Sequence, residues 1–310
     1  MGILVLGSFM MDLVVRTERA PVAGETLMGD SFGRFPGGKG ANQAVAAARL
    51  GGDVAMAGKV GRDAFGDEGL GVLEDNGVDT AHMLRDDEAT GVALIVVERS
   101  GQNRIIIAPG ANMRYTTDEA DALEEAIRRA DMLVMQLEID LAVVERAAAI
   151  AQKHGVPVLL NPAPARALPA ALLSRVSILT PNETELELLT GMKVECIESA
   201  GRAARTLLAL GVERVVVTVA EKGALLCTAE GDEHVEGFPV TPVDTVAAGD
   251  SFNGALAVKL VEGATLLEAA RFANAVGALA VTKQGAIPSL PTLAEVERFL
   301  TERNGRSPRP

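Results

Sequence analysis

The sequence predicts a three-layer α/β/α sandwich with a mostly parallel central sheet and a small additional β-sheet. Apolar, β-branched runs alternate with amphipathic segments along most of the 310 residues, and each run ends in glycine, proline or a polar turn. Buried strands separated by helices indicate a parallel sheet that is covered on both faces. Ligands of such sheets bind beyond the carboxyl ends of the strands, so we expect the site in the loops that follow them.

The main sheet and its helices are expected to form a single domain over residues 1–310. Its strands are predicted at residues 3–6, 132–137, 156–160, 178–179 and 215–219. Its helices are predicted at residues 118–129, 141–154 and 200–210. The polar, proline-containing residues 304–310 are expected to be a disordered tail.

Two β-rich segments interrupt this alternation. Residues 91–98 and 104–108, joined by Ser100-Gly101-Gln102-Asn103, predict a hairpin. Residues 13–15 and 26–34 are expected to add short strands. We therefore expect a small sheet built from about 13–35 and 91–108, which is either a lid or an edge extension of the main sheet.

Composition excludes several classes of function. A formal charge of −13 argues against nucleic acid as a partner, because its binders usually carry a basic patch. Neither the two cysteines nor the three histidines show metal-ligand spacing, and the cysteines predict no disulfide framework. No segment has the pattern of a signal peptide, and no apolar run approaches the roughly 20 residues that cross a bilayer. A cytoplasmic protein without a membrane partner is the expectation.

A glycine-rich segment, GGKGANQ at residues 37–43, precedes an alanine-rich helix expected at residues 44–50. Glycines permit close approach of a ligand to the backbone, and a helix N-terminus favours anions. The segment is not a P-loop, because Gly40 stands where Ser or Thr would hold magnesium. From the residues alone, a ligand loop and a flexible helix entry are equally good interpretations.

The first strand is followed by GSFMMD at residues 7–12, without the G-x-G-x-x-G fingerprint of dinucleotide-binding folds. Asp12 either faces a ligand or caps a turn, and the residues alone favour the cap. Thr180-Pro181-Asn182-Glu183 predicts a capping box with Pro at the first helical position. That structural role leaves Asn182 and Glu185 free to face the strand ends.

The segment DTVAAGDSFNG at residues 244–254 is the most informative one. Small residues lead into a predicted helix, where the amides of Ala248, Gly249 and Asp250 would form a nest for phosphate. Asp250 beside that nest can accept a proton from an attacking hydroxyl. An aspartate in a first helical turn is also a common partner of the helix dipole, so the motif alone leaves both roles open.

Together these motifs resemble the ribokinase family of carbohydrate kinases. The resemblance rests on GGKGANQAVAAARL (residues 37–50), NPAPA (161–165), TPNETE (180–185) and DTVAAGDSFNGAL (244–256), and it covers essentially the whole chain in order. It implies an ATP-dependent kinase that phosphorylates a sugar, with D-ribose and its 5-hydroxyl as the expected acceptor. ATP, Mg²⁺ and a monovalent cation, usually K⁺, are the implied cofactors.

The resemblance also implies roles for individual residues. Asp250 would be the catalytic base, and Ala247, Ala248 and Gly249 would form the anion hole for the phosphoryl group. The implied sugar site consists of Asp12, Gly38, Lys39, Asn42 and Glu138, closed over by Ala93 and Ile105. The implied nucleotide site consists of Asn182, Thr218, Val219, Ala220, Glu221, Lys222, Gly223, Gly249 and, near the adenine, Asn274.

Two metal sites and a dimer follow from the same resemblance. Glu185 would organise hydrated magnesium, which typically keeps several waters. The monovalent cation would bind oxygens of Asp244, Val246, Ala280, Lys283, Gly285 and Ser289. The small sheet would be a lid, and lids of two chains would pair in a homodimer.

One position departs from the family pattern. An asparagine often stands two residues before the sugar-binding aspartate, whereas this chain has Met10. A thioether is a poor partner for a hydroxyl, so a 2-deoxyribose kinase, or a kinase for another sugar or nucleoside, is the alternative. A catalytically idle sugar sensor is a further alternative, against which an intact Asp250, Gly249 and Glu185 argue. A nicotinamide dehydrogenase is excluded by the missing glycine fingerprint.

Overall fold

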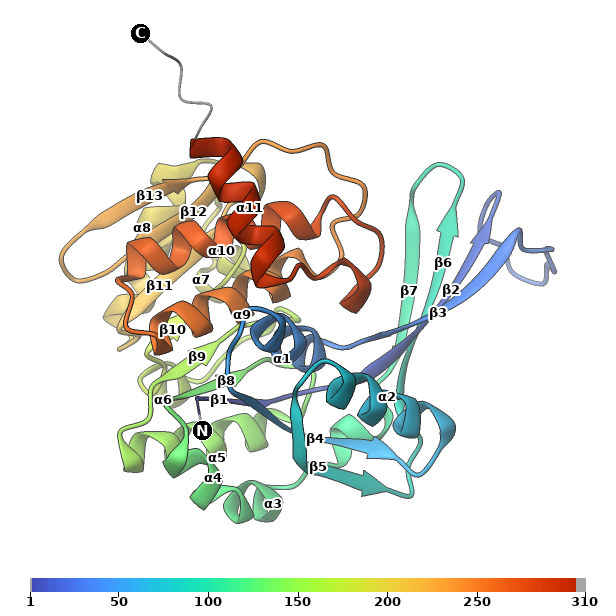
Figure 1. Cartoon of the computed structure of the whole chain (residues 1–310), viewed down its shortest axis with the longest axis horizontal. Helices are drawn as coiled ribbons and strands as arrows, with labels where there is room; N and C mark the ends of the chain where they lie inside the picture. The colour runs from blue at the N-terminus through green and yellow to red at the C-terminus, as the bar shows by residue number, and fades with distance from the viewer. Residues whose placement is uncertain (1, 305–310) are drawn as a thin grey trace, which may run out of the picture.

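A nine-stranded sheet runs through the molecule, as the computed structural model of residues 2–304 shows (Figure 1). The strand order is β13-β12-β11-β10-β9-β8-β1-β4-β5. The strands from β11 to β5 are parallel, and β12 and β13 form an antiparallel hairpin at one edge. The predicted, mostly parallel sheet is confirmed. Its strands are β1 (Ile3–Leu6), β4 (Val54–Gly61), β5 (Asp79–Asp86), β8 (Met132–Met135), β9 (Val158–Leu160), β10 (Ile178–Leu179), β11 (Arg214–Thr218), β12 (Gly223–Cys227) and β13 (Asp232–Glu236).

Helices cover both faces of this sheet (Figure 1). One face packs against α1 (Lys39–Arg49), α2 (Ala64–Asp75), α9 (Ala248–Val261), α10 (Leu266–Ala280) and α11 (Leu293–Asn304). The other packs against α3 (Thr117–Ala122), α4 (Glu124–Arg129), α5 (Leu141–His154), α6 (Ala170–Leu173), α7 (Glu183–Thr190) and α8 (Ile197–Ala209). Short 3₁₀ turns lie at Gly110–Arg114, Ala220–Lys222 and Ile287–Ser289. The predicted three-layer sandwich is therefore present.

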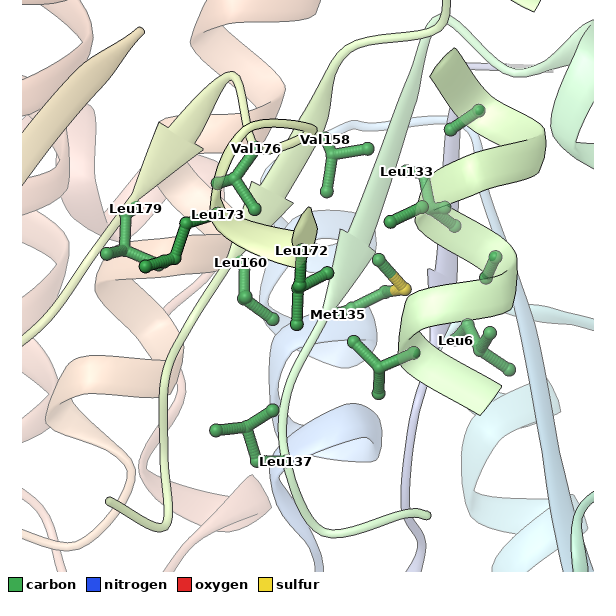
Figure 2. Packing of buried hydrophobic residues seen from close by; sticks show 14 of the residues in the cluster. Leu6, Leu133, Met135, Leu137, Val158, Leu160, Leu172, Leu173, Val176 and Leu179 are labelled. Carbon is green, nitrogen blue, oxygen red and sulfur yellow. The ribbon is translucent and has the colours of Figure 1, made fainter. Parts of the chain in front are cut away.

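The apolar strands are explained by burial on both sides. In β8, Leu133 and Met135 belong to the core beneath α3–α8, while Met132 and Val134 belong to the core beneath α1 and α9. Figure 2 shows Met135 and Leu160 of the sheet near Leu172 of α6, with Leu133 and Leu173 in the same cluster. Each fully buried side chain of this size contributes about 1.5–3 kcal/mol. Because both faces of such a strand are buried, its residues do not alternate between apolar and polar, and its sequence is a continuous apolar run.

A small sheet projects from the body (Figure 1). Its strands are β3 (Ser31–Gly37), β2 (Met10–Thr17), β6 (Gly91–Glu98) and β7 (Asn103–Ala108), in that spatial order. β2 follows β1 after three residues, so the small sheet starts at the carboxyl edge of the main one. Its outer parts expose large apolar side chains: Phe32 is 66%, Ile105 52% and Ile106 68% exposed.

Several boundaries differ from the sequence expectation. The helix predicted at 118–129 is two helices, because the chain breaks at Leu123, which turns into the core. The strand predicted at 156–160 begins only at Val158, after Pro157, which lacks an amide donor. The strand predicted at 132–137 ends at Met135, and the amide of Leu137 instead bonds the carbonyl of Ala163 (2.9 Å).

Two further expectations concern the chain's first helix and last residues. The helix expected at 44–50 starts at Lys39, so most of the glycine-rich segment is its first turn, and the strand expected at 26–34 is shifted to Ser31–Gly37. The tail predicted at 304–310 begins with the last residue of α11, and residues 305–310 lie outside the described residues. Among the helices of residues 2–304, none combines the length and the apolar character needed to cross a bilayer.

Candidate active site

The candidate site lies in the loops at the carboxyl ends of five neighbouring strands of the main sheet. These strands are β11, β10, β9, β8 and β1. β1 lies between β8 and β4, so the chain order reverses beside β1, where ligands of open α/β sheets bind. Hydrogen bonds connect these loops: Thr218 donates its amide to the carbonyl of Pro181 (3.0 Å), and Leu137 bonds Ala163 (2.9 Å). The expected position of the site is consistent with this topology.

The start of α1 is packed against the end of β1. Gly38 has φ +89°, and a Cβ there would lie 2.7 Å from the amide nitrogen of Met10. A Cβ on Gly40 would lie 2.5 Å from the amide nitrogen of Ser8, and the amide of Ala41 bonds the carbonyl of Ser8 (2.9 Å). Only glycine permits this approach, which brings Lys39 and Asn42 to the loop after the first strand.

Asp250 is buried in the first turn of α9 and faces α1. Asn42 Nδ2 donates to Asp250 Oδ2 (2.9 Å), and Gln43 Nε2 donates to Asp250 Oδ1 (3.0 Å). The two helices come close because a Cβ on Gly254 would lie 2.7 Å from the carbonyl of Gln43. Both oxygens of the carboxylate are thus held by side-chain amides.

The amino end of α9 is open. Ala247, the residue before the helix, has the left-handed conformation (φ 59°), and no side chain of the described residues caps the helix. The first amides of an α-helix have no intrahelical acceptor and carry the positive end of its dipole. A Cβ on Gly249 would meet no heavy atom of the described residues within 4 Å. Gly249 itself is exposed, so an anion can reach the helix start at this residue, one position before the buried Asp250.

Two more carboxylates lie near Asp250. Glu138 Oε2 accepts hydrogen bonds from the Ser8 hydroxyl (2.5 Å) and the Lys39 amide (2.9 Å). Burial, with added repulsion from Glu138 and Asp250, raises the pKa of Asp12 to about 7. The charge of Asp250 raises the pKa of Lys39, opposed by burial and aided by Glu138 and Glu185. The structure thus gathers an acidic pocket with one ammonium group beside it.

One face of the small sheet turns toward this pocket. Asp12 on β2 is in register with Ala93 on β6, which is in register with Ile107 on β7. Ile105 lies two residues from Ile107 and therefore on the same face, although it is 52% exposed. Met10 stands on this face too, is 3% exposed, and its Cγ would lie 3.3 Å from a Cβ on Gly91.

A buried acceptor in this region has no partner. Asn42 uses its amide nitrogen for Asp250, while its Oδ1 has no hydrogen-bond partner among residues 2–304. Buried polar groups are nearly always paired, and the exceptions call for an explanation. A hydroxyl of a bound ligand would satisfy this oxygen.

The prediction for Asn182 and Glu185 was wrong in one respect. They were expected to be free of the capping box, but they form it: Asn182 Oδ1 accepts from the Glu185 amide (2.8 Å), and Glu185 Oε2 accepts from the Asn182 amide (2.9 Å). Thr180, expected to cap, instead donates its hydroxyl to Asn253 Oδ1 (2.6 Å). The helix starts two residues later than expected, which moves the cap. Burial raises the pKa of Glu185, although the Asn182 amide opposes this.

The segment at residues 218–223 runs from the end of β11 through a 3₁₀ turn into β12. Ala220 has φ 49°, and a Cβ on Gly223 would lie 2.2 Å from the carbonyl of Val235. Asn274 on α10 donates to the carbonyls of Val235 (3.0 Å) and Glu236 (3.2 Å). Next to it is a cavity of about 400 Å³, lined by residues of β13, the loop after it and α10: His234, Val235, Glu236, Gly237, Phe238, Leu267 and Arg271.

The two segments expected to hold a monovalent cation lie together. Asp244 Oδ2 accepts from the Gly285 amide (3.0 Å), Asp244 Oδ1 from the Val246 amide (3.1 Å), and the Val243 amide bonds the carbonyl of Val281 (2.7 Å). Ser289 is buried and bonds Ala286, while Lys283 forms an ion pair with Glu295 (2.7 Å). Within the described residues no group of three or more His, Cys, Asp and Glu side chains is arranged for a metal ion.

Several buried residues of this region were not predicted to belong to the site. Gln43 contacts Asp250, and Ser8 contacts Glu138. Gln136 and Asn161 contact Gln43. Gln43 and Asn161 belong to the motifs GGKGANQ and NPAPA, on which the resemblance rests. Their place in these motifs could have indicated that they belong to the site. Gln136 is only the first polar residue after the apolar strand β8, and nothing in the sequence marks it.

A carboxylate beside a helix start without a side-chain cap, at the carboxyl ends of parallel strands, suits the transfer of a phosphoryl group to a hydroxyl of a small molecule. The chain belongs to the pfkB family of carbohydrate kinases, whose sequence profile matches residues 2–293.

Relatives with names are similar over nearly the whole chain. A ribokinase of Haemophilus influenzae is 44% identical over 297 residues, which are 96% of this chain and 97% of that protein. A deoxyribokinase of Salmonella typhi is 40% identical over 303 residues, covering 97% and 99%. The solved structure of Arabidopsis thaliana ribokinase complexed with ribose and ATP matches with a TM-score of 0.93 and 37% identity, covering 96% and 98%.

Proposed function

We propose that this chain transfers the γ-phosphoryl group of ATP to the 5-hydroxyl of D-ribose, giving ribose 5-phosphate and ADP. The observation that carries the proposal is the Asp250 carboxylate, which two amides hold beside the open start of α9. Full-length similarity to ribokinases supports ATP and ribose as the substrates. A carboxylate next to a binding site for phosphate can take the proton of the attacking hydroxyl, which a kinase needs and a sugar sensor does not.

Asp250 acts as the general base on the sugar hydroxyl. Phosphoryl transfer has a loose transition state, so positioning and neutralisation of charge dominate the catalysis. The amides at the start of α9, from Ala247 to Gly249, would stabilise the phosphoryl oxygens. The small sheet would cover the pocket and exclude water, which would otherwise accept the phosphoryl group.

The acidic pocket holds the sugar. Asp12 and Glu138 accept hydrogen bonds from sugar hydroxyls, and Asn42 Oδ1, which lacks a partner among the described residues, accepts another. Lys39 and the backbone at Gly38 lie at the same helix start. Ala93 and Ile105 close over the sugar from the face of the small sheet that carries Asp12.

The nucleotide lies beyond α9, along Asn182 and residues 218–223, with Asn274 near the adenine. Capping occupies Asn182 Oδ1 and Glu185 Oε2, so Asn182 Nδ2 and Glu185 Oε1 are the atoms assigned to the nucleotide side. Glu185 with phosphate oxygens and water is a donor set that magnesium accepts, because Mg²⁺ usually takes one or two carboxylates and keeps several waters. Bound magnesium would neutralise charge on the transferring phosphate.

A monovalent cation, K⁺ in the first instance, is proposed between residues 244–246 and 280–289. The supporting observation is that Asp244 already joins the two segments through Gly285. The site would take oxygens of Asp244, Val246, Ala280, Lys283, Gly285 and Ser289. An ion there would fix the loop that leads into α9 without contacting the substrate.

A homodimer through the small sheet completes the proposal. The exposed Leu94 and Ile106 support it: they are register partners on the face of the small sheet opposite Asp12, and exposed apolar surface marks interfaces. The chain is further proposed to act as one catalytic domain over residues 1–310, with the small sheet as its lid, and to work in the cytoplasm.

A second candidate is phosphorylation of 2-deoxyribose. Met10 on the sugar-facing side of β2 favours it, because its thioether offers no good partner to a hydroxyl. The deoxyribokinase of Salmonella typhi is 40% identical to this chain, against 44% for the ribokinase of Haemophilus influenzae, over a similarly long part of it.

The deciding experiment measures ADP formation by the purified chain with ribose, 2-deoxyribose, fructose and adenosine. Highest kcat/KM for ribose supports the proposal, and highest kcat/KM for 2-deoxyribose supports the second candidate. Binding of ribose without any ADP formation would identify a sensor and would overturn both.

A further inference from the structure

Gln43 is completely buried between polar side chains, and the mechanism above gives it no role. Its Nε2 donates to Asp250 Oδ1 (3.0 Å) and to Asn161 Oδ1 (3.2 Å). Its Oε1 accepts from Gln136 Nε2 (2.7 Å). One amide therefore joins α1, the residues that follow β8 and β9, and the first turn of α9.

The orientation of this amide is fixed from three sides. A carboxylate only accepts, so Asp250 requires the nitrogen of Gln43. Asn161 donates its own Nδ2 to the carbonyl of Thr180 (3.1 Å) and so presents its oxygen to Gln43 as well. A rotation of the Gln43 amide by half a turn would place its oxygen against two acceptors.

The same constraint extends to Gln136. Because Gln43 presents an oxygen on that side, Gln136 must present its Nε2. Its Oε1 then has no partner among the described residues and lies against Gly7, where a Cβ would be only 2.0 Å from it. An unpaired buried acceptor is unfavourable. The hydrogen bond between Gln43 and Asp250 is thus formed although it leaves Gln136 Oε1 without a partner among the described residues.

We infer that Gln43 is a positioning residue for Asp250, held in its orientation by Asn161 and Gln136. The inference rests on the proposed function, in which Asp250 is the base. Each carboxylate oxygen accepts from one amide, Oδ1 from the fully buried Gln43 and Oδ2 from Asn42, which is itself proposed to bind the sugar. We therefore assign the proton to Oδ2. In that step the hydroxyl proton passes to Oδ2, the hydroxyl oxygen bonds the γ-phosphorus, and the bond to the bridging oxygen breaks, its electron pair leaving with ADP.

The first test is a double-mutant cycle. Gln43→Met keeps the volume and removes the donor, and it should lower kcat about 10–100-fold while KM for sugar and ATP changes less than about 3-fold. In the Asp250→Asn background the same substitution should lower the residual rate by less than about 2-fold, because Gln43 acts through the carboxylate. An equal loss in both backgrounds would show a merely structural role and overturn the inference.

The second test does not need activity. Gln43→Glu places a second carboxyl in a fully buried position beside Asp250, and both burial and the like charge raise the pKa of the introduced carboxyl in the folded state. A raised folded-state pKa costs stability as pH rises above the unfolded value, so Tm should fall between pH 5.5 and pH 8 by at least ~2 °C more than in the wild type. Adding Asp250→Asn should reduce this extra fall to the part that burial alone causes, and Gln102→Glu in an exposed turn should not produce it.

The outcomes separate the inference from the proposed function. If the wild type phosphorylates a sugar other than ribose, the cycle is measured on that sugar and the inference is still tested. If it phosphorylates no sugar, the proposed function and the base role fail together. An active wild type with a pH-independent Tm difference for Gln43→Glu overturns the positioning inference alone.

Discussion

Asn42 Nδ2 donates a 2.9 Å hydrogen bond to Asp250 Oδ2, and so joins two residues that are 208 positions apart in the chain. The contact brings the glycine-rich start of α1 against the first turn of α9. A residue proposed to bind the sugar is thereby bonded to the residue proposed to remove the sugar's proton. In the proposed function, this contact therefore couples the position of the sugar to the position of the base.

Asp250→Asn tests the base. The amide keeps the shape of the carboxylate but cannot take a proton, and loss of a general base typically lowers the rate about 10²–10⁴-fold. The loose transition state favours the lower part of that range. One of the two donors, Asn42 or Gln43, then faces an NH₂ group, so the free energy of unfolding should fall by about 1–3 kcal/mol. A folded variant that keeps more than about half of the wild-type kcat would remove Asp250 from the mechanism.

Gly249→Ala tests the anion site. A Cβ at Gly249 meets no heavy atom of the described residues within 4 Å, so the substitution should leave the fold intact. The methyl group would enter the space assigned to the phosphoryl group, and kcat/KM should fall about 10²-fold or more. Gly71→Ala is the matched control: its Cβ also meets nothing within 4 Å, but it lies in α2, and activity should not change. Equal activity of both variants would place the phosphoryl group elsewhere.

The raised pKa of Asp12 predicts that the free energy of unfolding of the ligand-free protein depends on pH. Burial raises its pKa to about 7, so the folded chain keeps a proton that the unfolded chain loses near the ordinary value of 3.8. Stability should therefore fall as pH rises from about 4 to 7, by at most ~1.4 kcal/mol per pH unit from this group. Urea unfolding of wild type and Asp12→Asn at pH 5, 6 and 7 measures the difference. The wild type should lose more stability than the variant over this interval, and parallel curves would contradict the raised pKa.

The sequence predicted the local elements well and the side-chain network only in part. β1, β6 and β10 have the expected bounds, as does α5, which starts after the cap Asp140 and ends at the left-handed Gly155. These features depend on neighbours in the chain. Contacts such as Gln43 with Gln136 depend on how distant segments pack, and no local pattern encodes them. The Asn182–Glu185 cap was missed for a local reason, a helix start misplaced by two residues.

Replacement of sodium by potassium tests the cation site. If an ion joins residues 244–246 to residues 280–289, activity should rise several-fold in K⁺ or Cs⁺ at equal ionic strength, because the loop before α9 becomes ordered. Asp244→Asn weakens the charge on this site and should reduce that activation. Equal rates in Na⁺, K⁺ and Cs⁺, after removal of contaminating potassium, would argue that the two loops are held by protein contacts such as Asp244 with Gly285.

Met10→Asn tests the choice between ribose and 2-deoxyribose. Met10 is 3% exposed and stands two residues before Asp12, on the same face of β2. If it faces carbon 2 of the pentose, ribose presents its 2-hydroxyl to a thioether, and a buried hydroxyl without a partner costs about 1–3 kcal/mol, or roughly 5–150-fold in specificity. Asparagine supplies a donor and an acceptor, so the ratio of kcat/KM for ribose to that for 2-deoxyribose should rise at least several-fold. Met10→Leu, which offers no hydrogen bond, should leave the ratio near that of the wild type. An unchanged ratio in Met10→Asn would mean that another residue, with Asp12 as the first candidate, reads carbon 2.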